Sequence, residues 1–458
     1  MAGSNGLFLP QQQQPEPQKQ KPLQTHYPSP DRLVAIGDLH GDLDKSKQAF
    51  RLAGLIDASD RWCGGSTTVV QIGDVLDRGG EELKILYFLE KLKREAVKCG
   101  GQLITLHGNH EIMNVEGDFR YVTPKGLEEF DVWAYWYGVG NDMKSLCHGL
   151  EKPKDPFHGI PLSFRGVPEK FYHSIRSRIA ALRPDGPIAR RFLANNVTVL
   201  VVGDSVFVHG GLLDKHVDYG LEKINEEVRD WINGLMGRRA PAYCKGRNAV
   251  VWLRKFSDEL AKNCDCSLLE HVLATIPGAK RMIMGHTIQE IGINGACDNR
   301  AIRIDVGMSK GCINGLPEVL EINRNSGLRV LTSNPLYQNQ TKSYADGGRK
   351  DSLGLLMPEH GPKQVETGHA IRYLSQFVVG FSIGFNSVWQ LTLLTLAVVP
   401  LIAIACGAYT IIMSTLSEKG EAAYAEAGKV AEEVICQQIK RLKAIFLYMK
   451  SKFVEKLE

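Results

Sequence analysis

The chain has 458 residues, which is enough for two or more domains and a large hydrophobic core. Its formal net charge of +4 is too small to indicate a nucleic-acid-binding protein. Ten cysteines in a chain of this length do not make the disulfide framework of a small secreted domain, and the first residues lack the basic start and long apolar core of a secretory signal. Composition therefore favours a large globular protein.

The N-terminal segment is expected to lack a packed core. Residues 11–22 read QQQQPEPQKQKP, a low-complexity run that is poor in the apolar side chains needed for folding. From Leu33 to about Pro335 the composition becomes that of a globular protein. We therefore expect a disordered segment over residues 1–30 and a globular domain over residues 31–340.

Three short apolar runs each end in residues that bind metal ions or phosphate. They read LVAIGDLHGD, VVQIGDVLDRG and LITLHGNHE, and the apolar part of each is typical of a buried strand. The polar residues after these strands are Asp38, His40, Asp74, Asp77, Arg78, Asn109 and His110. Residues 81–99 carry apolar side chains on one face and precede Gly100, which predicts a helix between the second and third runs. This order predicts βαβ units, in which the carboxyl ends of the strands meet at one edge.

A long insert follows the third motif. Between His110 and His209 there is no further metal motif, but aromatic residues are concentrated at Phe130, Trp133, Tyr135, Trp136 and Tyr137. We expect these aromatic side chains to form the core of a helical subdomain. The alternative is a wall or lid over the polar edge of the sheet, since insertions on site-bearing loops often shape specificity.

Further strands are expected in the second half of this domain. Residues 197–202 and 206–208 are strand-like and precede His209, whereas residues 281–285 precede His286. These strands, with a last one at residues 301–305, lie too close together for crossover helices, which predicts antiparallel pairs and mixed sheets. The fold class is therefore α/β with helical insertions.

Cys264 and Cys266 form a C-x-C pair. We expect them to be a pair of ordinary thiols, and a redox role is the alternative. A zinc site is not expected, because no second Cys/His pair lies at zinc-finger spacing.

The polar residues at the strand ends fit a centre of two divalent metal ions. Two ions about 3.5–4 Å apart can polarise a phosphoryl group and generate hydroxide from water. The expected ligands are Asp38, His40, Asp74, Asn109, His209 and His286, with Asp74 bridging the two ions. Because no cysteine belongs to this set, Mn, Fe or Zn fits better than a softer ion.

The remaining residues of the motifs suggest acid catalysis and phosphate binding. His110 directly follows a ligand, so it can lie near the centre and protonate a leaving alkoxide or phenoxide, with Asp77 as its partner. Arg78 offers a forked donor for phosphate oxygens, and Arg254 in VVWLRKF is a second candidate. A single Asp-x-His pair is weak evidence, but the ordered set GDLHG, GDVLDRG, GNHE, HGG and GHT is strong.

At these motifs the chain resembles the phosphoprotein phosphatases of the calcineurin-like metallophosphoesterase family. It is most similar to the plant Shewanella-like protein phosphatases, over about Leu33 to Pro335. The resemblance implies a mixed β-sandwich flanked by helices, and a catalytic domain over residues 31–340. It also implies in-line attack of a metal-bridging hydroxide on a phosphoprotein substrate.

The same resemblance bears on substrate and localisation. Leu76 within GDVLDRG, the large inserts and the GHT motif depart from the Ser/Thr enzymes of the wider family. The Shewanella-like group is associated with phosphotyrosine, so phosphotyrosyl substrates are expected. The chain is similar to the non-plastid branch, which implies the cytosol or mitochondria. Two other functions stay open: a dinucleoside polyphosphate hydrolase of the same fold, and a non-catalytic, membrane-tethered scaffold.

The C-terminal quarter has a different character. Residues 341–366 are expected to be a linker, and the chain then has no Asp, Glu, Lys or Arg from Tyr373 to Ser417. That run is longer than the roughly 20 residues that one membrane span requires, and a polar break at residues 386–390 predicts a transmembrane-like helical hairpin. The basic tail over residues 436–458 is expected either to lie on a membrane surface or to be a solvated or disordered tail.

Residues 367–435 resemble one transmembrane hairpin of subfamily B ABC transporters. No GxxxxGK[ST] loop occurs in the chain, so no nucleotide-binding domain is expected. Two interpretations remain: a phosphatase that meets the membrane through residues 373–413, or a fused or mispredicted gene. A single transcript spanning Val365 to Arg372 would rule out the second.

Overall fold

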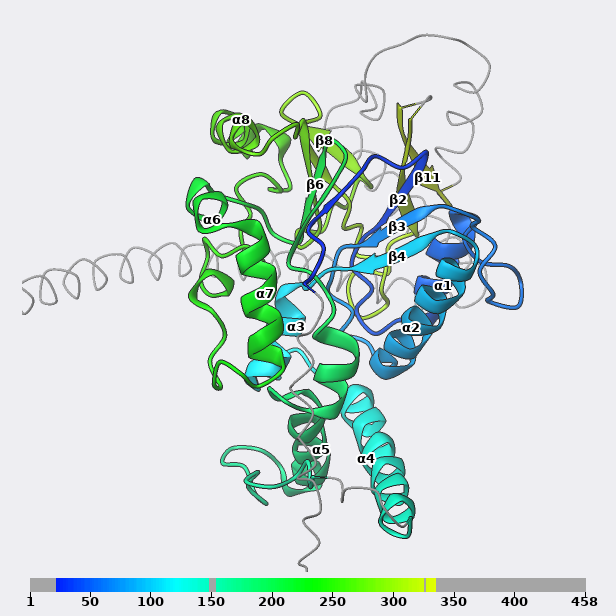
Figure 1. The fold of residues 1–458 in the computed structure, drawn as a ribbon, viewed down its shortest axis with the longest axis vertical. Helices are drawn as coiled ribbons and strands as arrows, with labels where there is room; N and C mark the ends of the chain where they lie inside the picture. Colours follow the sequence, from blue (N-terminus) through cyan, green and yellow to red (C-terminus); the bar gives the residue numbers. More distant parts are fainter. Residues whose placement is uncertain (1–21, 148–153, 325–326, 335–458) are drawn as a thin grey trace, which may run out of the picture. The chain divides into compact units, whose positions relative to one another are not determined.

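The computed structural model describes residues 22–147, 154–324 and 327–334. These residues form two β-sheets with helices beside them, and one hydrophobic core contains side chains from both sheets (Figure 1). The expected α/β fold, a pair of mixed sheets flanked by helices, is confirmed for this part of the chain.

The first sheet carries the three strands of the opening motifs. Its five strands, in spatial order, are β11 (Gly327–Thr332), β10 (Glu318–Asn323), β2 (Arg32–Ile36), β3 (Thr68–Gln71) and β4 (Gln102–Thr105). β2, β3 and β4 run parallel, whereas β10 pairs antiparallel with β2. Parallel pairing aligns the carboxyl ends of β2, β3 and β4 at one edge.

The second sheet carries the histidine motifs of the second half. Its six strands, in spatial order, are β1 (His26–Tyr27), β5 (Val199–Val202), β6 (Ser205–Val208), β7 (Arg281–Met284), β9 (Ala301–Arg303) and β8 (Asn294–Ala296). β5 and β6 are antiparallel, but β6, β7 and β9 are parallel. The expected N-terminal disorder therefore does not extend over β1, which pairs with β5.

Helices surround the two sheets. They are α1 (Leu43–Leu52), α2 (Glu82–Lys98), α3 (Asn109–Glu116), α4 (Pro124–Ser145), α5 (Tyr172–Leu182), α6 (Asp214–Tyr219), α7 (Leu221–Ile232) and α8 (Cys266–Thr275). Short helical turns cover Glu169–Phe171, Ala189–Leu193, Ala242–Cys244 and Ala261–Asn263. Helices α1 and α2 lie beside the first sheet, and α6, α7 and α8 lie on the side of the second (Figure 1). The helix predicted over residues 81–99 is α2.

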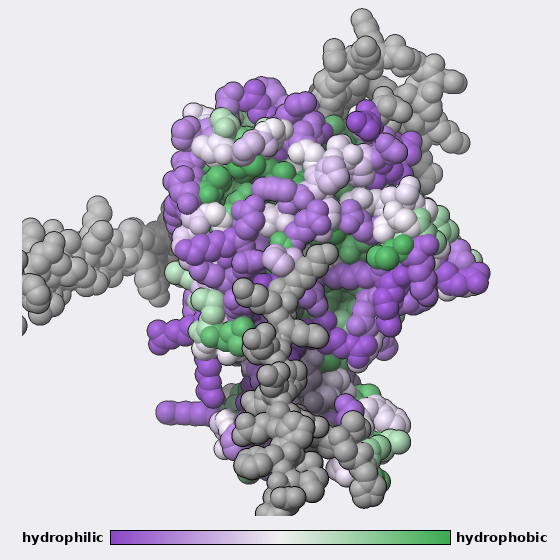
Figure 2. All heavy atoms as spheres, viewed as in Figure 1, coloured by the Kyte–Doolittle hydropathy of each residue, from purple (hydrophilic) through white to green (hydrophobic). Residues whose placement is uncertain are grey.

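The aromatic insert is only partly a packed core. Phe130 and Trp133 on α4 are buried, as expected. Tyr135 and Trp136 are 65% and 64% exposed, so the expectation is wrong for these two side chains. Successive helical positions point to different sides of the helix, and only one side of α4 faces the core. The face drawn in Figure 2 is mainly hydrophilic, with hydrophobic residues in small separate groups.

The cysteines pair differently from the expectation. Cys266 forms a disulfide with Cys297, and Cys264 is a buried free thiol, so the predicted pair of thiols at positions 264 and 266 is wrong. The bond joins the start of α8 to the turn between β8 and β9. A partner 31 residues away cannot be recognised from C-x-C spacing alone.

We expect loss of this disulfide to destabilise the fold. Closing a loop of this length restricts the unfolded chain, so the double variant Cys266→Ser/Cys297→Ser should lower the free energy of unfolding by about 2–4 kcal/mol. Urea denaturation of oxidised proteins measures the change. Cys63→Ser, at an exposed free cysteine, is the control and should leave the midpoint unchanged. An unchanged midpoint in the double variant would contradict the prediction.

The membrane hairpin predicted for residues 373–413 lies outside the described residues, as do the linker and the basic tail. Among the helices that the structure describes, none is long and apolar enough to cross a membrane.

Candidate metal centre and active site

The ends of five strands meet at one polar cluster. β2, β3 and β4 lead into it from the first sheet, and β6 and β7 lead into it from the second. The six predicted metal ligands all lie there: Asp38, His40, Asp74, Asn109, His209 and His286. None of these residues is more than 8% exposed. Buried polar side chains at this density need partners, because desolvation without compensation is costly.

Asp74 lies at the centre of the cluster. Its Oδ2 atom is 3.2 Å from Nε2 of His209 and 3.5 Å from Nε2 of His40. The same oxygen is 3.9 Å from Nε2 of His110. One carboxylate therefore faces imidazoles delivered by both sheets, which is the arrangement that a bridging ligand requires.

Two groups of potential ligand atoms share Asp74. In each group the ligand atoms lie within 4.8 Å of one another. One group joins Asp74 to His40 and His110, and the other joins it to His209 and His286. The first differs from the sequence-based expectation, which placed His110 outside the ligand set.

Asp38 and Asn109 lie against the second group. Oδ2 of Asp38 accepts a hydrogen bond from the backbone N–H of His286 at 3.2 Å, and its Oδ1 is 4.0 Å from Nδ1 of His209. Oδ1 of Asn109 is 3.0 Å from Nε2 of His209. The sequence suggested that Asp38 and His40 share one ion. In the structure, Asp38 instead lies against His209 and His286.

Two buried atoms in the cluster have no hydrogen-bond partner within the described part of the chain. They are Oδ1 of Asp38 and Nε2 of His286. Buried polar atoms are usually satisfied, so each such exception calls for an explanation. A divalent cation fits both, because a carboxylate oxygen and an imidazole nitrogen are ligands for Mn, Fe and Zn.

Burial lowers the pKa of two imidazoles in the cluster, and neighbouring histidines lower that of Asp74. Burial, with the nearby His110, lowers the pKa of His40 to about 4. Burial and the neighbouring His209 hold the pKa of His286 well below its usual value. Although burial opposes it, the surrounding imidazoles hold the pKa of Asp74 well below its ordinary range. Neutral imidazoles and an ionised carboxylate are the forms that bind metal.

The backbone of the site is strained. Several non-glycine residues there have left-handed φ angles: His40 (42°), Asp74 (53°), Asp77 (69°), Arg78 (64°) and His286 (68°). Such conformations are uncommon and cluster at functional sites, where the surrounding fold maintains them.

Glu111 helps to hold the Asp74 turn in this conformation. Its carboxylate accepts backbone N–H bonds from Asp74, Val75, Leu76 and Gly108. A side chain at Gly108 would overlap the Asp74 carboxylate, which explains the glycine of GNHE. The sequence places Glu111 beside the motif, but nothing in the spacing shows that it binds a neighbouring turn.

The predicted acid and its partner are in contact. Nδ1 of His110 lies 2.6 Å from Oδ2 of Asp77. The other oxygen of Asp77 accepts hydrogen bonds from Arg178 at 3.1 Å and Asn114 at 3.0 Å. Sequence reasoning missed Arg178 and Asn114, because both lie on helices and neither belongs to a strand-end motif.

The two predicted phosphate-binding arginines lie at the margin of the cluster. The Arg78 guanidinium lies 5.0 Å from the centre of the Tyr121 ring, and its Nε has no hydrogen-bond partner among the described residues. Arg254 is exposed and donates to the carbonyl of His286 at 3.0 Å and to the hydroxyl of Thr287 at 2.7 Å.

Comparisons with known proteins agree with this architecture. Residues 31–290 match the calcineurin-like phosphoesterase family. Shewanella-like protein phosphatase 2 of Arabidopsis thaliana is 68% identical over 364 residues, which are 79% of this chain and 92% of that protein. The chain belongs to the Shewanella-like protein phosphatases. Shewanella-like protein phosphatase 1 of Plasmodium berghei is 30% identical over 288 residues, covering 61% of this chain and 67% of that protein.

This Shewanella-like phosphatase is therefore a metallophosphoesterase that acts on phosphoproteins, and its family uses a dinuclear metal centre. Of the three functions that the sequence left open, its relatives support the protein phosphatase.

The C-terminal resemblance is also found among known proteins. Residues 366–443 of this phosphatase match the ABC transporter transmembrane region. ABC transporter B family member 14 of Arabidopsis thaliana is 75% identical over 72 residues, which are 16% of this chain and only 6% of that transporter.

One carboxylate of this phosphatase was not assigned a role from the sequence. Asp305 follows β9, is buried, and its charge acts on the carboxyl group of Asp38. Burial raises the pKa of Asp38 well above its usual value, and the charge of Asp305 contributes. The sequence contained a pattern that could have identified Asp305, because it follows an apolar strand as Asp38 and Asp74 do.

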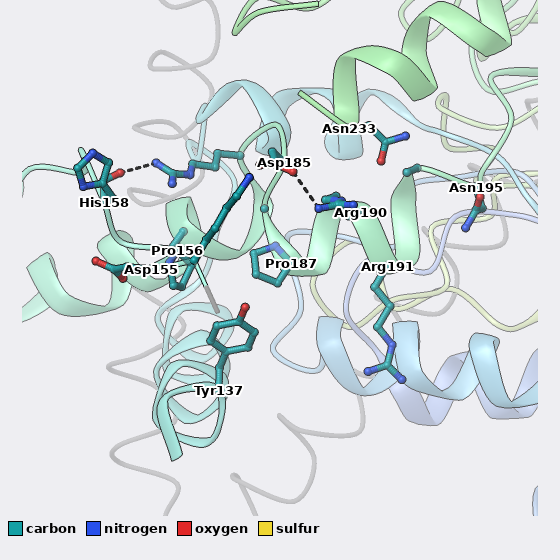
Figure 3. Close-up of a pocket in the computed structure, with 15 residues that line it drawn as sticks. Tyr137, Asp155, Pro156, His158, Asp185, Pro187, Arg190, Arg191, Asn195 and Asn233 are labelled. Carbon is teal, nitrogen blue, oxygen red and sulfur yellow. Dashed lines mark hydrogen bonds and ion pairs between the residues drawn. The ribbon is translucent and has the colours of Figure 1, made fainter. Parts of the chain in front are cut away.

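A cavity of about 850 Å³ lies beside α5 of this Shewanella-like phosphatase (Figure 3). Arg183, Arg190 and Arg191 line it, together with Asp155 and Asp185. Arg183 donates to the His158 carbonyl, and Arg190 pairs with Asp185. No predicted site residue lines the cavity, so it is separate from the metal-ligand cluster.

Proposed function

We propose that this phosphatase hydrolyses phosphotyrosyl proteins with the polar cluster as its active site. The observation that carries the proposal is the convergence of His40, His209 and His110 on Oδ2 of Asp74, with Asp77 directly behind His110. A bridging carboxylate, imidazole ligands and a proton donor are the parts that metal-assisted phosphomonoester hydrolysis needs.

Six residues would hold the two metal ions. They are Asp38, His40, Asp74, Asn109, His209 and His286, and the unpaired atoms of Asp38 and His286 point to this role. When bound, such ions supply Lewis-acid polarisation of a phosphoryl group and acidify water at neutral pH. The identity of the ions is proposed from the ligand chemistry, which fits Mn, Fe or Zn.

His110 would protonate the leaving oxygen. Burial alone would lower its pKa, but the carboxylates of Asp74 and Asp77 raise it above the ordinary value. The raised pKa favours the protonated form of the ring. The 2.6 Å contact with Asp77 fixes Nδ1, which leaves Nε2 as the atom that faces Asp74 and the reacting group.

An aromatic side chain beside these groups favours a phosphotyrosyl substrate. Tyr121 is 38% exposed, and its ring centroid lies 5.0 Å from that of His110. The Arg78 guanidinium lies over the same ring. A substrate phenyl ring packed against Tyr121 would place its ester oxygen between a phosphate-binding cation and a proton donor.

Arg78 and Arg254 would bind the phosphate oxygens. We expect Arg78→Ala to raise the KM for a phosphotyrosyl peptide about 10–100-fold, because a hydrogen bond between charged groups contributes about 1.5–3 kcal/mol. Steady-state kinetics measures the change. Arg120→Ala removes a neighbouring exposed arginine that pairs only with Asp118 in the described structure, and it should leave KM unchanged. Equal KM values for both variants would contradict the role of Arg78.

The substrate proposal is tested with metal-reconstituted enzyme and three substrates. Phosphotyrosyl peptides should be hydrolysed faster than phosphoseryl peptides of the same sequence, and diadenosine tetraphosphate should not be hydrolysed. A preference for phosphoseryl peptides would contradict the phosphotyrosine assignment but leave the metal site standing. Rapid hydrolysis of the dinucleotide would instead favour a dinucleoside polyphosphate hydrolase.

The transporter-like region determines where the phosphatase would act. We propose no transport activity, because one hairpin cannot form a transport pathway and the match covers 6% of the transporter. A transcript that joins Val365 to Arg372, together with retention of the protein in carbonate-washed membranes, would support a membrane-tethered phosphatase. A transcript that lacks this junction would remove the anchor and leave the cytosol or mitochondria as the expected compartment.

A further inference from the structure

We propose that Arg178 is a positioning residue that holds Asp77 in line with His110, so that the helical insert controls the alignment of the acid. The inference rests on the proposed roles of His110 and Asp77 and extends them to α5. Arg178 lies 101 residues after Asp77, on a helix that carries no metal motif.

The guanidinium of Arg178 is fully buried and hydrogen-bonded on all sides. Nη2 donates to Oδ1 of Asp77 at 3.1 Å and to Oε2 of Glu82 at 2.6 Å. Nη1 donates to Oε1 of Glu82 at 3.0 Å, and Nε donates to Oδ1 of Asn114 at 2.8 Å. All four side chains have no exposed surface. A forked donor is therefore matched to acceptor oxygens on three buried side chains.

These contacts fix the orientation of the Asp77 carboxylate. One of its oxygens contacts Nδ1 of His110, and the other accepts hydrogen bonds from Arg178 and Asn114. Asn114 also donates to the backbone carbonyl of His110 at 2.9 Å, which links the same network to the start of α3. Rotation of the carboxylate would break bonds on both sides at once. The tilt of the His110 ring therefore depends on where Arg178 is held.

The insert holds Arg178 in place by packing. The guanidinium carbon lies 4.6 Å from the centre of the Phe130 ring, and Phe130 belongs to α4. Helices α4 and α5 pack against each other and lie below the two sheets in Figure 1. A planar cation stacked on a ring and bonded along its edge has little rotational freedom. A lysine ammonium keeps the charge but cannot reproduce this planar set of bonds.

The first experiment measures kcat and KM of the full-length, metal-reconstituted enzyme on two aryl phosphates. Phenyl phosphate has a basic leaving oxygen that needs a proton, and p-nitrophenyl phosphate has a weakly basic one that does not. Arg178→Lys should lower kcat for phenyl phosphate by about tenfold or more, since a positioned acid contributes 10²–10⁴-fold. It should change p-nitrophenyl phosphate turnover and both KM values little.

Matched variants separate alignment from general damage. Arg183 lies on the same insert, and its side chain hydrogen-bonds only to the His158 carbonyl in the described structure. Arg183→Lys should therefore leave kcat for both aryl phosphates unchanged. In an Asp77→Asn background, Arg178→Lys should lower kcat for phenyl phosphate by less than about a further twofold, because the two residues act through one contact. An equal loss with both aryl phosphates, or an undiminished effect in the Asp77→Asn background, would overturn the role of Arg178.

His110→Asn distinguishes failure of this inference from failure of the proposed function. If His110→Asn slows phenyl phosphate selectively and Arg178→Lys does not, only the inference fails. If His110→Asn slows both substrates equally, the acid assignment fails and the inference with it. If the Arg178→Lys protein does not fold, the same kinetics are measured with Asn114→Ser, because Asn114 is the other donor to Oδ1 of Asp77. It should give the same selective loss, and an equal loss with both substrates would overturn the inference.

Discussion

Asp74→Asn is expected to reduce phosphotyrosyl-peptide turnover by a factor on the order of 10⁴. The two metal ions that Asp74 would hold supply several kcal/mol of transition-state stabilisation, and each 1.36 kcal/mol changes the rate about tenfold. Oδ2 of Asp74 lies within 4 Å of three imidazoles from both sheets. An amide at this position has no charge to bridge two cations. The variant should therefore lose bound metal as well as kcat.

The control for this substitution is Asp218→Asn. Asp218 is exposed, and removing its charge should leave both metal content and kcat at wild-type values. Turnover and metal content are measured on the same preparations after reconstitution. An Asp74→Asn enzyme that binds a full complement of metal and keeps wild-type kcat would rule out Asp74 as the bridging ligand.

His110→Asn is expected to lower kcat for phosphotyrosyl peptides about 10²–10⁴-fold, with little change in KM. An asparagine side chain can lie in the same space but cannot deliver a proton to the leaving oxygen. The effect should be largest for substrates with basic leaving groups, and a series of substituted phenyl phosphates measures it directly. His110 is also near Asp74, so metal content must be measured with the kinetics.

A substitution at an exposed histidine provides the comparison. His271 has a side chain that is 68% exposed, and His271→Asn should leave kcat unchanged. If His110→Asn loses metal in proportion to its activity, the ring acts as a ligand with His40 and Asp74, in accord with their close grouping. If metal content and turnover both stay at wild-type values, the acid role is wrong.

The strand-end motifs predicted most of the candidate site because the physical rule behind them is local. A buried apolar run followed by Gly and Asp marks both a strand and the turn that ends it. Parallel pairing of β2, β3 and β4 then brings Asp38, Asp74 and Asn109 to one edge. The second sheet adds His209 and His286 by the same rule.

Contacts between distant segments were not predictable in this way. Arg178 lies on a helix whose sequence gives no indication that it reaches the Asp77 carboxylate. Cys297 forms the disulfide with Cys266, but local spacing drew attention to Cys264 instead. Both contacts depend on how elements pack, and packing is a property of the whole fold rather than of a short pattern.

The alternation of exposure along α4 gives a third example. Five aromatic residues in one stretch suggested a core, yet Tyr135 and Trp136 face solvent. Composition alone does not determine which side of a helix is covered. The hydrophobic periodicity of α4 is weak, because apolar residues occur all round it, so the buried side follows from its packing against α5 and α2.

The most direct test of the two-metal phosphatase is a metal titration of chelator-treated, full-length enzyme followed by phosphotyrosyl-peptide turnover. The two-metal mechanism predicts that Mn²⁺ binds with a stoichiometry of two ions per chain, that activity appears as the sites fill, and that Asp74→Asn binds fewer ions and stays inactive. Full activity of the metal-free chain, or activity that saturates with a single ion per chain, would contradict it.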